Sequence, residues 1–254
     1  EENITLLLNC SCASLTMDGS RIVSVTGWQL TTYTWHTVRA KIFMDCSGDS
    51  VLAPMCGAEY RMGREGRDEY NEDIAPEVAD EKTMGMGCLI QARETGHPIK
   101  FTPPKWAYVY DSDEYFPHRG HDLNGPTMNY WWMELGGEQD TIRDSEEIRD
   151  ELLKVAFGVW DHIKNYGDHH AENWDLEWMG FLPGKRESIR YIGDHVMTQN
   201  DVRSEGKFDD LVAYGGWTMD DHHPGGFNWP GQPTIFHPAP APFGIPYRTM
   251  YSKN

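Results

Sequence analysis

Apolar positions predict strands along the N-terminal part of the chain. Residues 4–8 form a continuous apolar run, which is typical of a strand buried on both faces. Residues 13–17 and 21–26 flank an Asp-Gly pair at 18–19, so we expect a hairpin closed by a tight turn. The pattern over 33–38 predicts one more strand, and this part of the chain should therefore be rich in β-structure.

The clearest helical pattern covers residues 145–166. Asp144 with Glu147 is typical of a capping box, and Gly167 is a natural stop. Apolar residues recur at intervals of three and four along one face, namely Ile148, Leu152, Val155, Ala156, Val159, Trp160 and Ile163. We therefore expect a packing helix whose solvated face carries Asp161, His162 and Lys164.

In residues 100–135 and 215–246 the pattern of apolar and polar positions predicts secondary structure less clearly. Residues 100–110 and 127–135 predict sheet, and residues 111–125 between them predict a long loop of the kind that is often functional. Glycine and proline crowd residues 215–246, which favours an irregular segment that lines a ligand.

Charge and length narrow the classes of function. The chain has 254 residues, and 40 acidic against 22 basic side chains leave a formal charge of -18. Such a surface argues against nucleic acid or an anionic membrane as partner, because both bind basic surfaces. No apolar run approaches the roughly 18 residues that a membrane-spanning helix needs. We expect a soluble protein and prefer the cytoplasm, although the true N-terminus is not visible.

The five cysteines do not have the spacing of a disulfide framework. Cys10 and Cys12 would share one face of a strand, which leaves a metal pair open. The absence of any C-x-x-C argues against a four-cysteine iron–sulfur cluster. We expect all five to be small buried residues and no metal site in this chain.

One stretch, residues 40–53, carries the strongest functional pattern. It predicts a strand over 40–45, a turn of small residues and the start of a helix. Gly48 and its small neighbours would let a ligand approach the backbone closely. Asp49 would stand at the helix N-terminus and could accept hydrogen bonds from the hydroxyls of a ribityl or ribose chain. An aspartate that only caps a turn fits the same pattern.

The wider sequence supports the first interpretation, in which Asp49 contacts a ligand. Asp45-Cys46-Ser47-Gly48-Asp49, followed by Leu52-Ala53 and by residues 56–60, resembles the second flavin-contacting motif of the FAD-dependent oxidoreductase family with a glutathione-reductase-like FAD domain. Cys46 and Ser47 stand where the family usually has Ala and Thr, and Ser50 stands where it has Gly. The resemblance continues in three further segments, at 61–69, 186–194 and 245–248.

This resemblance implies an α/β fold, with a partial FAD/NAD(P)-binding (glutathione-reductase-like) domain and an inserted α+β mixed-sheet substrate domain. Residues 1–80 would be the partial FAD-binding domain, 81–182 the inserted domain with the helix over 145–166, and 183–254 a return towards the flavin and substrate site. The family's G-x-G-x-x-G unit and its last flavin-closing segment are not found. We therefore expect an internal portion that a second chain or segment completes, and that does not hold FAD well alone.

The resemblance assigns Ser47, Gly48, Asp49 and Arg186 to the cofactor. Arg186 and Arg190 lie four apart, so a helical turn would place both on one face as an anion site for flavin carbonyls or a substrate carboxylate. Glu187 could equally neutralise one of them. We expect Arg190 to bind substrate, together with two aromatic residues, Trp131 and Trp132.

His222 and His223 are the candidate catalytic residues, in a segment that resembles the family's D-x-H motif. A histidine with a pKa near neutrality could take a hydroxyl proton as hydride leaves the carbon. Asp220 and Asp221 with these histidines could instead bind a metal or be surface polar residues. A second pair, His169 and His170, follows the long helix and is expected to interact with its dipole.

The predicted function is hydride transfer between FAD and a small polar, hydroxyl-bearing substrate, an activity that this portion need not show in isolation. The competing hypothesis is a non-catalytic carbohydrate-binding protein on a degenerate flavoprotein scaffold. Flavin absorbance would favour the enzyme, whereas sugar affinity without flavin would favour the binding protein.

Overall fold

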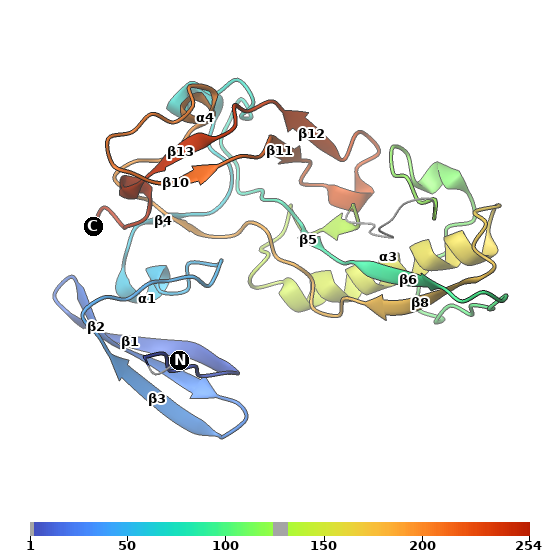
Figure 1. Cartoon of the computed structure of the whole chain (residues 1–254), viewed down its shortest axis with the longest axis horizontal. Coiled ribbons are helices and arrows are strands. Elements are labelled where there is room, and N and C mark those ends of the chain that lie inside the picture. The colour runs from blue at the N-terminus through green and yellow to red at the C-terminus, as the bar shows by residue number, and fades with distance from the viewer. Residues whose placement is uncertain (1–2, 124–131) are drawn as a thin grey trace. The chain divides into compact units, whose positions relative to one another are not determined.

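The computed structural model describes residues 3–123 and 132–254. The chain forms two compact units (Figure 1). Unit 1 comprises Glu1–Arg61, Ile189–Gly215 and Pro242–Asn254, and unit 2 comprises Met62–Ser188 and Gly216–Ala241. The chain therefore leaves unit 1 and returns to it twice. The three functional segments expected from the sequence stay a prediction.

Unit 1 begins with the expected hairpin and a third strand. β1 (Cys10–Asp18), β2 (Arg21–Gln29) and β3 (Thr34–Arg39) form an antiparallel sheet in the order β1-β2-β3. Asp18 pairs with Arg21 across the turn, where Gly19 takes the left-handed φ of 60° that glycine accepts most readily. Local alternation and the turn residues were sufficient to predict this sheet.

Shorter elements complete unit 1. Two antiparallel pairs join β4 (Tyr60–Arg61) to β9 (Arg190–Tyr191) and β10 (Leu211–Gly215) to β13 (Phe243–Pro246). The helical segments are α1 (Ala53–Cys56), α4 (Gln199–Arg203) and the 3₁₀ turn η3 (Tyr247–Thr249).

The strands expected over 4–8 and 40–45 are wrong: neither segment pairs with another strand in the part of the chain that the structure describes. A strand exists only through the hydrogen bonds of a neighbour, which an apolar run alone does not supply. Leu7 and Phe43 are partly buried, but five other large apolar side chains of these segments are between 63% and 79% exposed, namely Ile4, Leu6, Leu8, Ile42 and Met44.

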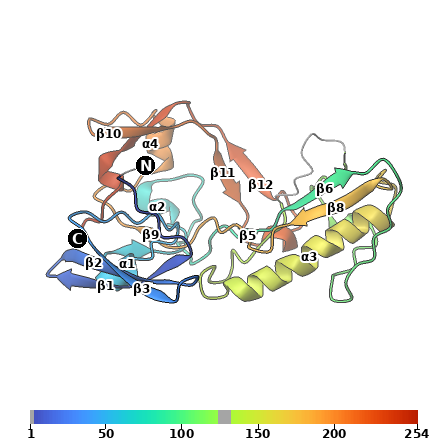
Figure 2. The same ribbon diagram turned by 60° about the horizontal axis from the view of Figure 1, so that its bottom comes forward.

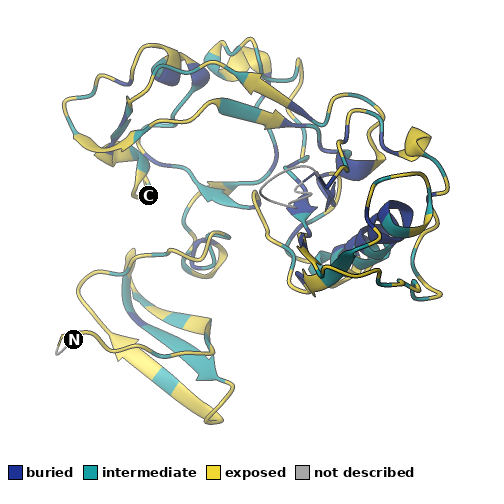
Figure 3. Ribbon diagram, turned by 45° about the vertical axis from the view of Figure 1, so that its right-hand side comes forward, coloured by how far each residue is buried: buried dark blue, intermediate teal, exposed yellow. Residues whose placement is uncertain are grey.

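Unit 2 is built around one long helix, α3 (Ser145–Asn165), close to the predicted bounds. Two strands, β6 (Ile90–Glu94) and β8 (Trp174–Met179), pair antiparallel and run alongside it (Figure 2). Apolar residues from the helix and these strands share one core, and Figure 3 shows the buried face of the helix in dark blue. This core is the main source of hydrophobic stabilisation in unit 2.

The other elements of unit 2 are short. β5 (Met86–Gly87) pairs with β7 (Glu134–Leu135), and β11 (Met219–His222) with β12 (Thr234–His237), both antiparallel. The helical segments are α2 (Arg67–Tyr70), η1 (Asp113–Tyr115) and η2 (Gly226–Asn228).

Details of α3 correct the sequence interpretation. All seven predicted stripe residues are buried, but Asp161 and His162, expected on the solvated face, are also buried. Asp161 accepts a hydrogen bond from Asn165 at 2.6 Å, and His162 contacts a loop, so tertiary partners cover this face. The expected capping box does not form, because Asp144 accepts from the Asp140 amide instead.

The sheet expected over 100–110 is absent, since that segment forms no strand. Pro103 and Pro104 lack the N–H donors that a ladder needs. From the stretch 127–135 only β7 forms a strand among the described residues, and 127–131 lie outside them. Every described strand pair is antiparallel, so the glutathione-reductase-like arrangement stays a prediction.

All five cysteines are free thiols, and only Cys88 is buried, contrary to the expectation for the whole set. Burial raises the pKa of the Cys88 thiol to about 11, so it stays protonated at neutral pH. Within the described ranges we find no helix with the length and apolar character to cross a membrane.

Candidate functional site

The turn after residue 44 in unit 1 is organised by Asp45. Its carboxylate accepts hydrogen bonds from the Ser47 hydroxyl at 2.6 Å, the Ser47 amide at 3.0 Å, the Leu52 amide at 2.9 Å and the Tyr191 hydroxyl at 2.7 Å. Burial alone would raise the pKa of Asp45, but these bonds outweigh it and leave that pKa lowered. Asp45 therefore closes the loop as a charged group.

Asp49 does not stand at a helix N-terminus, which corrects the expectation. α1 begins at Ala53 and has four residues, with Leu52 as its N-cap. The Asp49 amide donates to the Ser47 hydroxyl at 3.3 Å, as does the Val51 amide at 3.2 Å. The turn is thus held by its own short polar side chains, and Asp49 is half-buried on it.

Two left-handed residues shape this turn. Gly48 has a φ of 81°, and Ser50, which stands where the resembling family has Gly, has a φ of 47°. The Ser50 hydroxyl donates to the Ile189 carbonyl at 2.9 Å, which holds this uncommon conformation. A Cβ added at Gly48 would meet nothing within 4 Å, so the space above the turn is open to a ligand.

A cavity of about 590 Å³ lies beside the turn, within unit 1. Asp45, Cys46 and Tyr191 contribute to its wall, whereas Ser47, Gly48 and Asp49 do not. Burial, and then the hydrogen bond to Asp45, raise the pKa of Tyr191, which remains a neutral hydroxyl. The three predicted cofactor residues of the turn are therefore neighbours in sequence of the cavity wall, and Asp45, which accepts a hydrogen bond from Ser47, belongs to that wall.

A second polar cluster lies in unit 2, around the buried carboxylate of Glu134 on β7. Arg186 donates to its Oε1 at 2.8 Å, and His222 on β11 contacts its Oε2 at 2.8 Å. The side chains of Glu134 and His222 are 6% and 3% exposed. Because a carboxylate only accepts hydrogen bonds, His222 donates from Nδ1 and its basic nitrogen is Nε2.

The structure thus brings Arg186 and His222, which the sequence proposed as site residues, to one carboxylate. That carboxylate belongs to Glu134, which the sequence analysis missed. Glu134 is the single acidic residue in an otherwise apolar run, residues 131–135. A charge in such a run is rarely buried without a partner, and this signal could have identified it. Arg186 is neutralised by Glu134 rather than by the neighbouring Glu187.

His223 has a different environment from His222. Its ring stacks on Trp229 with centroids 3.9 Å apart, and its Nδ1 accepts a hydrogen bond from the Gly225 amide at 3.1 Å. Its Nε2 is therefore an N–H donor in the neutral ring. Burial, followed by the charge of Arg64, lowers the pKa of His223, which favours that neutral form.

The arginine pair does not share a helical face, because the chain around residues 185–189 has no helix. Arg186 belongs to unit 2, whereas Arg190 lies on β9 of unit 1, paired with Arg61. Asp220 and His222 alternate with Asp221 and His223 along β11 and its end, so the four side chains do not converge on one ion.

Of the two predicted aromatic substrate residues, Trp131 lies outside the described residues. Trp132 is buried, donates from its indole nitrogen to the Gly120 carbonyl at 3.0 Å and stacks on Phe227. Its role in substrate binding stays a prediction.

Unit 2 also contains a cavity of about 700 Å³ with an aromatic wall, formed by Tyr108, Tyr110, Tyr115, Phe227 and Trp229. Arg119 reaches this cavity from a buried position and donates to the carbonyls of Gly226 at 2.8 Å and Trp229 at 2.7 Å. Its Nε is buried without a hydrogen-bond partner among the described residues. Burial lowers the pKa of this guanidinium, which nevertheless remains charged, so the cavity carries a positive group.

Comparison with known proteins identifies the family. No curated protein and no solved structure matches the chain. The sequence model of one family, FAD dependent oxidoreductase, matches residues 1–254. FAD is the cofactor of that family, and its members have a flavin-linked redox role. The chain belongs to the FAD dependent oxidoreductase family.

Proposed function

We propose that this protein transfers a hydride between FAD and a small hydroxyl-bearing substrate. The family match supports the flavin-linked redox part of this proposal. The aromatic cavity around Arg119 supports the substrate class, because aromatic faces pack on a carbon skeleton while a buried cation favours a polar or anionic group. FAD, when bound, supplies the two-electron chemistry, and the protein supplies binding, orientation and proton transfer.

The turn in unit 1 fits part of the cofactor. The space above Gly48 is open, and Asp49 offers a carboxylate beside it, whereas the Ser47 hydroxyl already donates to Asp45 at 2.6 Å. A carboxylate suits the hydroxyls of the ribityl chain. Asp45 would keep the turn in shape through its four hydrogen bonds. The assignment of Arg186, in unit 2, to the flavin stays a prediction.

His222 is the better candidate for proton transfer. A carboxylate that orients a histidine through Nδ1 leaves Nε2 as the basic atom, the arrangement that catalytic dyads use. Arg186 donates to the other oxygen of Glu134 and so fixes the orientation of this carboxyl group. His223, as an N–H donor, would hydrogen-bond to a substrate or cofactor oxygen rather than accept a proton.

An anaerobic substrate panel tests the function. Protein in the presence of saturating FAD is mixed with polyols, sugars and hydroxy acids, and loss of the oxidised flavin absorbance is followed. We expect reduction by at least one hydroxyl class. Absence of reduction by every class, in protein that a chemical reductant still bleaches, would refute the proposed substrate.

Variants then test the residues. His222→Gln is expected to slow flavin reduction by about 10²–10⁴-fold, the usual contribution of a general base. His170→Gln, an exposed histidine elsewhere in unit 2, is the control and should leave the rate unchanged. Equal rates for His222→Gln and wild type would remove His222 from the mechanism.

We also propose a partner, a second chain or segment that covers the exposed apolar residues 4–8 and 40–45. Patches of this kind on soluble proteins commonly mark interaction sites. The family match gives no support to the non-catalytic carbohydrate-binding alternative.

A further inference from the structure

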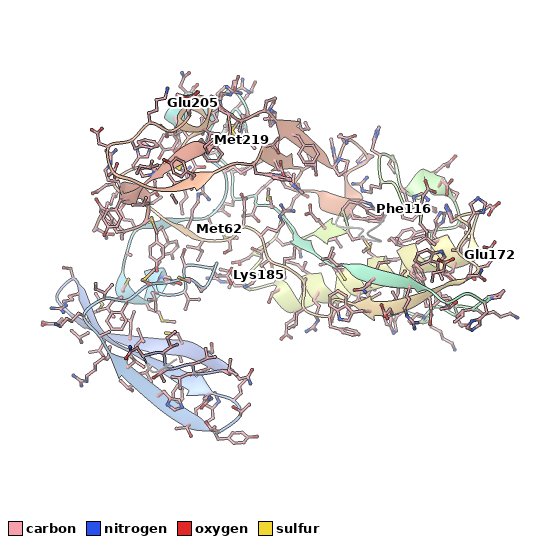
Figure 4. All side chains as sticks on the ribbon, in the orientation of Figure 1. Met62, Phe116, Glu172, Lys185, Glu205 and Met219 are labelled. Carbon is pink, nitrogen blue, oxygen red and sulfur yellow. The ribbon has the colours of Figure 1, made fainter. Side chains whose placement is uncertain are left out.

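Three histidines and one aspartate converge in unit 2 at the C-terminal end of α3, away from the Glu134 cluster. Asp113 begins η1, His121 lies in the following loop, His162 is in the last turn of α3 and His169 follows that helix. One ligand atom from each lies within 4.8 Å of all the others. Phe116, labelled in Figure 4, packs against the rings of His121 and His162.

The distances are those of atoms that share a ligand. Asp113 Oδ1 lies 2.9 Å from His162 Nε2, 3.4 Å from His121 Nε2 and 3.6 Å from His169 Nε2. The Nε2 atoms of His162 and His169 are 3.1 Å apart. Ligands at 2.0–2.1 Å from a tetrahedral zinc ion are about 3.3 Å from one another, so these separations bracket the expected value.

Hydrogen bonds to the other ring nitrogens fix which atom faces the centre. His162 donates from Nδ1 to the Tyr110 carbonyl at 2.8 Å, and His121 donates from Nδ1 to the Arg119 carbonyl at 3.0 Å. A carbonyl can only accept, so in the neutral rings both Nε2 atoms carry lone pairs. This outer arrangement, an Nδ1–H on a backbone carbonyl, is the usual one for histidines that bind a metal through Nε2.

Without a cation, the same centre is poorly satisfied. Two Nε2 lone pairs would face the Asp113 carboxylate, which also only accepts hydrogen bonds. The three imidazole rings are packed closely around this point, with centroids 4.7–5.0 Å apart. A cation between the lone pairs and the carboxylate removes this conflict.

We propose that Asp113, His121, His162 and His169 bind one divalent transition-metal ion, of which zinc fits best. Three imidazoles and one carboxylate are ligands that zinc accepts, and four protein ligands are typical of a structural site rather than a catalytic one. The side chains of His162, His169 and His121 are 1%, 7% and 12% exposed, whereas that of Asp113 is 72% exposed, so Asp113 lies on the open side.

The local backbone supports this role. Gly167, directly after the helix, has a left-handed φ of 71°, and a Cβ there would lie 3.0 Å from His169 Nε2. Glycine at 167 therefore permits the turn that returns His169 to the helix end. The ion would join two loops to α3, and it would stabilise unit 2 independently of the flavin.

The cluster includes one residue that corrects a sequence expectation, because His162 was expected on the solvated face of the helix and is buried. The interaction of His169 with the helix dipole stays a prediction. The partners of both histidines lie in a loop about fifty residues earlier, so no local pattern could reveal the cluster.

Metal content and affinity test the proposal on the full chain. Protein stripped with a chelator is dialysed against zinc, and bound zinc is measured by mass spectrometry. We expect one tightly bound zinc ion per chain. Asp113→Asn and His169→Ala should each weaken zinc affinity by about tenfold or more, because removing a ligand affects affinity at least as much as removing its outer partner. His170→Ala is the matched control, an adjacent histidine whose side chain is 81% exposed, and should bind zinc as wild type does.

Two further readouts keep the test decisive. Asp113 is exposed, so Asp113→Asn should fold, and circular dichroism checks this. Cobalt in place of zinc should give the intense visible absorption of a tetrahedral site in wild type and lose it in Asp113→Asn. Zinc should raise the unfolding temperature of wild type, with little effect on Asp113→Asn. No tightly bound zinc in wild type, or affinity unchanged in both ligand variants, would overturn the proposal.

Discussion

Single side chains with several hydrogen bonds decide the shape of the turn over residues 45–52 in unit 1, which we call the flavin-motif turn. The sequence pointed to Asp49, because aspartate in such a motif accepts hydroxyl hydrogen bonds. In the structure the Asp45 carboxylate accepts four hydrogen bonds that hold the turn, one of them from Tyr191, which is remote in sequence. That partner lies 146 residues away, so the motif alone could not separate the structural aspartate from the candidate ligand.

Asp45→Asn should destabilise unit 1 and change its pH dependence. Hydrogen bonds to a charged group contribute about 1.5–3 kcal/mol to stability, and the neutral amide weakens them. The folded pKa of Asp45 is lowered, so its stabilisation is complete above the unfolded value near 4 and is lost as pH falls through the folded pKa. Denaturant unfolding should therefore show a gap between wild type and Asp45→Asn at pH 7 that closes in acid.

Asp18→Asn is the control for this measurement, since Asp18 lies on the exposed hairpin of the same unit. It should track wild type at both pH values. A gap for Asp45→Asn that stays constant from pH 7 to pH 2 would contradict the role of its charge.

At the scale of elements, sequence patterns correctly predicted those elements that form through interactions between neighbouring residues. The hairpin of β1 and β2 and the helix α3 follow from alternation, turn residues and the 3.6-residue period. The strands expected over 4–8, 40–45 and 100–110 failed, since pairing depends on a distant neighbour. The prediction that His162 is exposed to solvent was wrong for a related reason, because a loop distant in sequence covers that face of the helix.

A substitution at Gly158, inside α3, separates the effect of close packing on stability from the effect of helix propensity. Glycine inside a helix is usually about 0.5–1 kcal/mol less stable than alanine. A Cβ at Gly158 would lie 2.4 Å from the Tyr108 carbonyl oxygen, in backbone that also donates from its amide to Lys154. Gly158→Ala should therefore lower the free energy of unfolding by about 1–3 kcal/mol, the usual cost of overpacking, despite its better propensity.

Gly216→Ala is the comparison, because a Cβ there meets nothing within 4 Å. It should leave chemical unfolding nearly unchanged. If Gly158→Ala proves more stable than wild type, the close approach of residue 108 to α3 is wrong.

At the scale of the whole molecule, two units carry different parts of the proposed activity. Unit 1 holds the flavin-motif turn, and unit 2 holds the aromatic cavity, the Glu134 cluster and the proposed metal centre. The family could be recognised from motifs spread along the chain, and the match over residues 1–254 confirms it. The contacts within the two polar clusters of unit 2 could not be predicted, because each joins side chains from segments far apart in sequence.

The exposed apolar residues of unit 1 should bind a hydrophobic dye. Leu6→Ser combined with Ile42→Ser is expected to reduce the fluorescence of bound anilinonaphthalene sulfonate, since both side chains are exposed. Val78→Ser with Leu182→Ser, two exposed apolar residues of unit 2, is the control. An equal loss in both double variants would argue against a specific partner surface on 4–8 and 40–45.

Flavin binding by the turn is the central claim, and titration of the purified chain with FAD, followed by flavin fluorescence, tests it most directly. We predict weak, saturable quenching, because the sequence contains no G-x-G-x-x-G turn to take the pyrophosphate. Asp49→Ala should raise the dissociation constant by about 10–150-fold, which corresponds to the 1.5–3 kcal/mol of hydrogen bonds to a charged group. Asp18→Ala should bind as wild type does. Equal affinity of Asp49→Ala and wild type, or no saturable quenching at all, would contradict the claim.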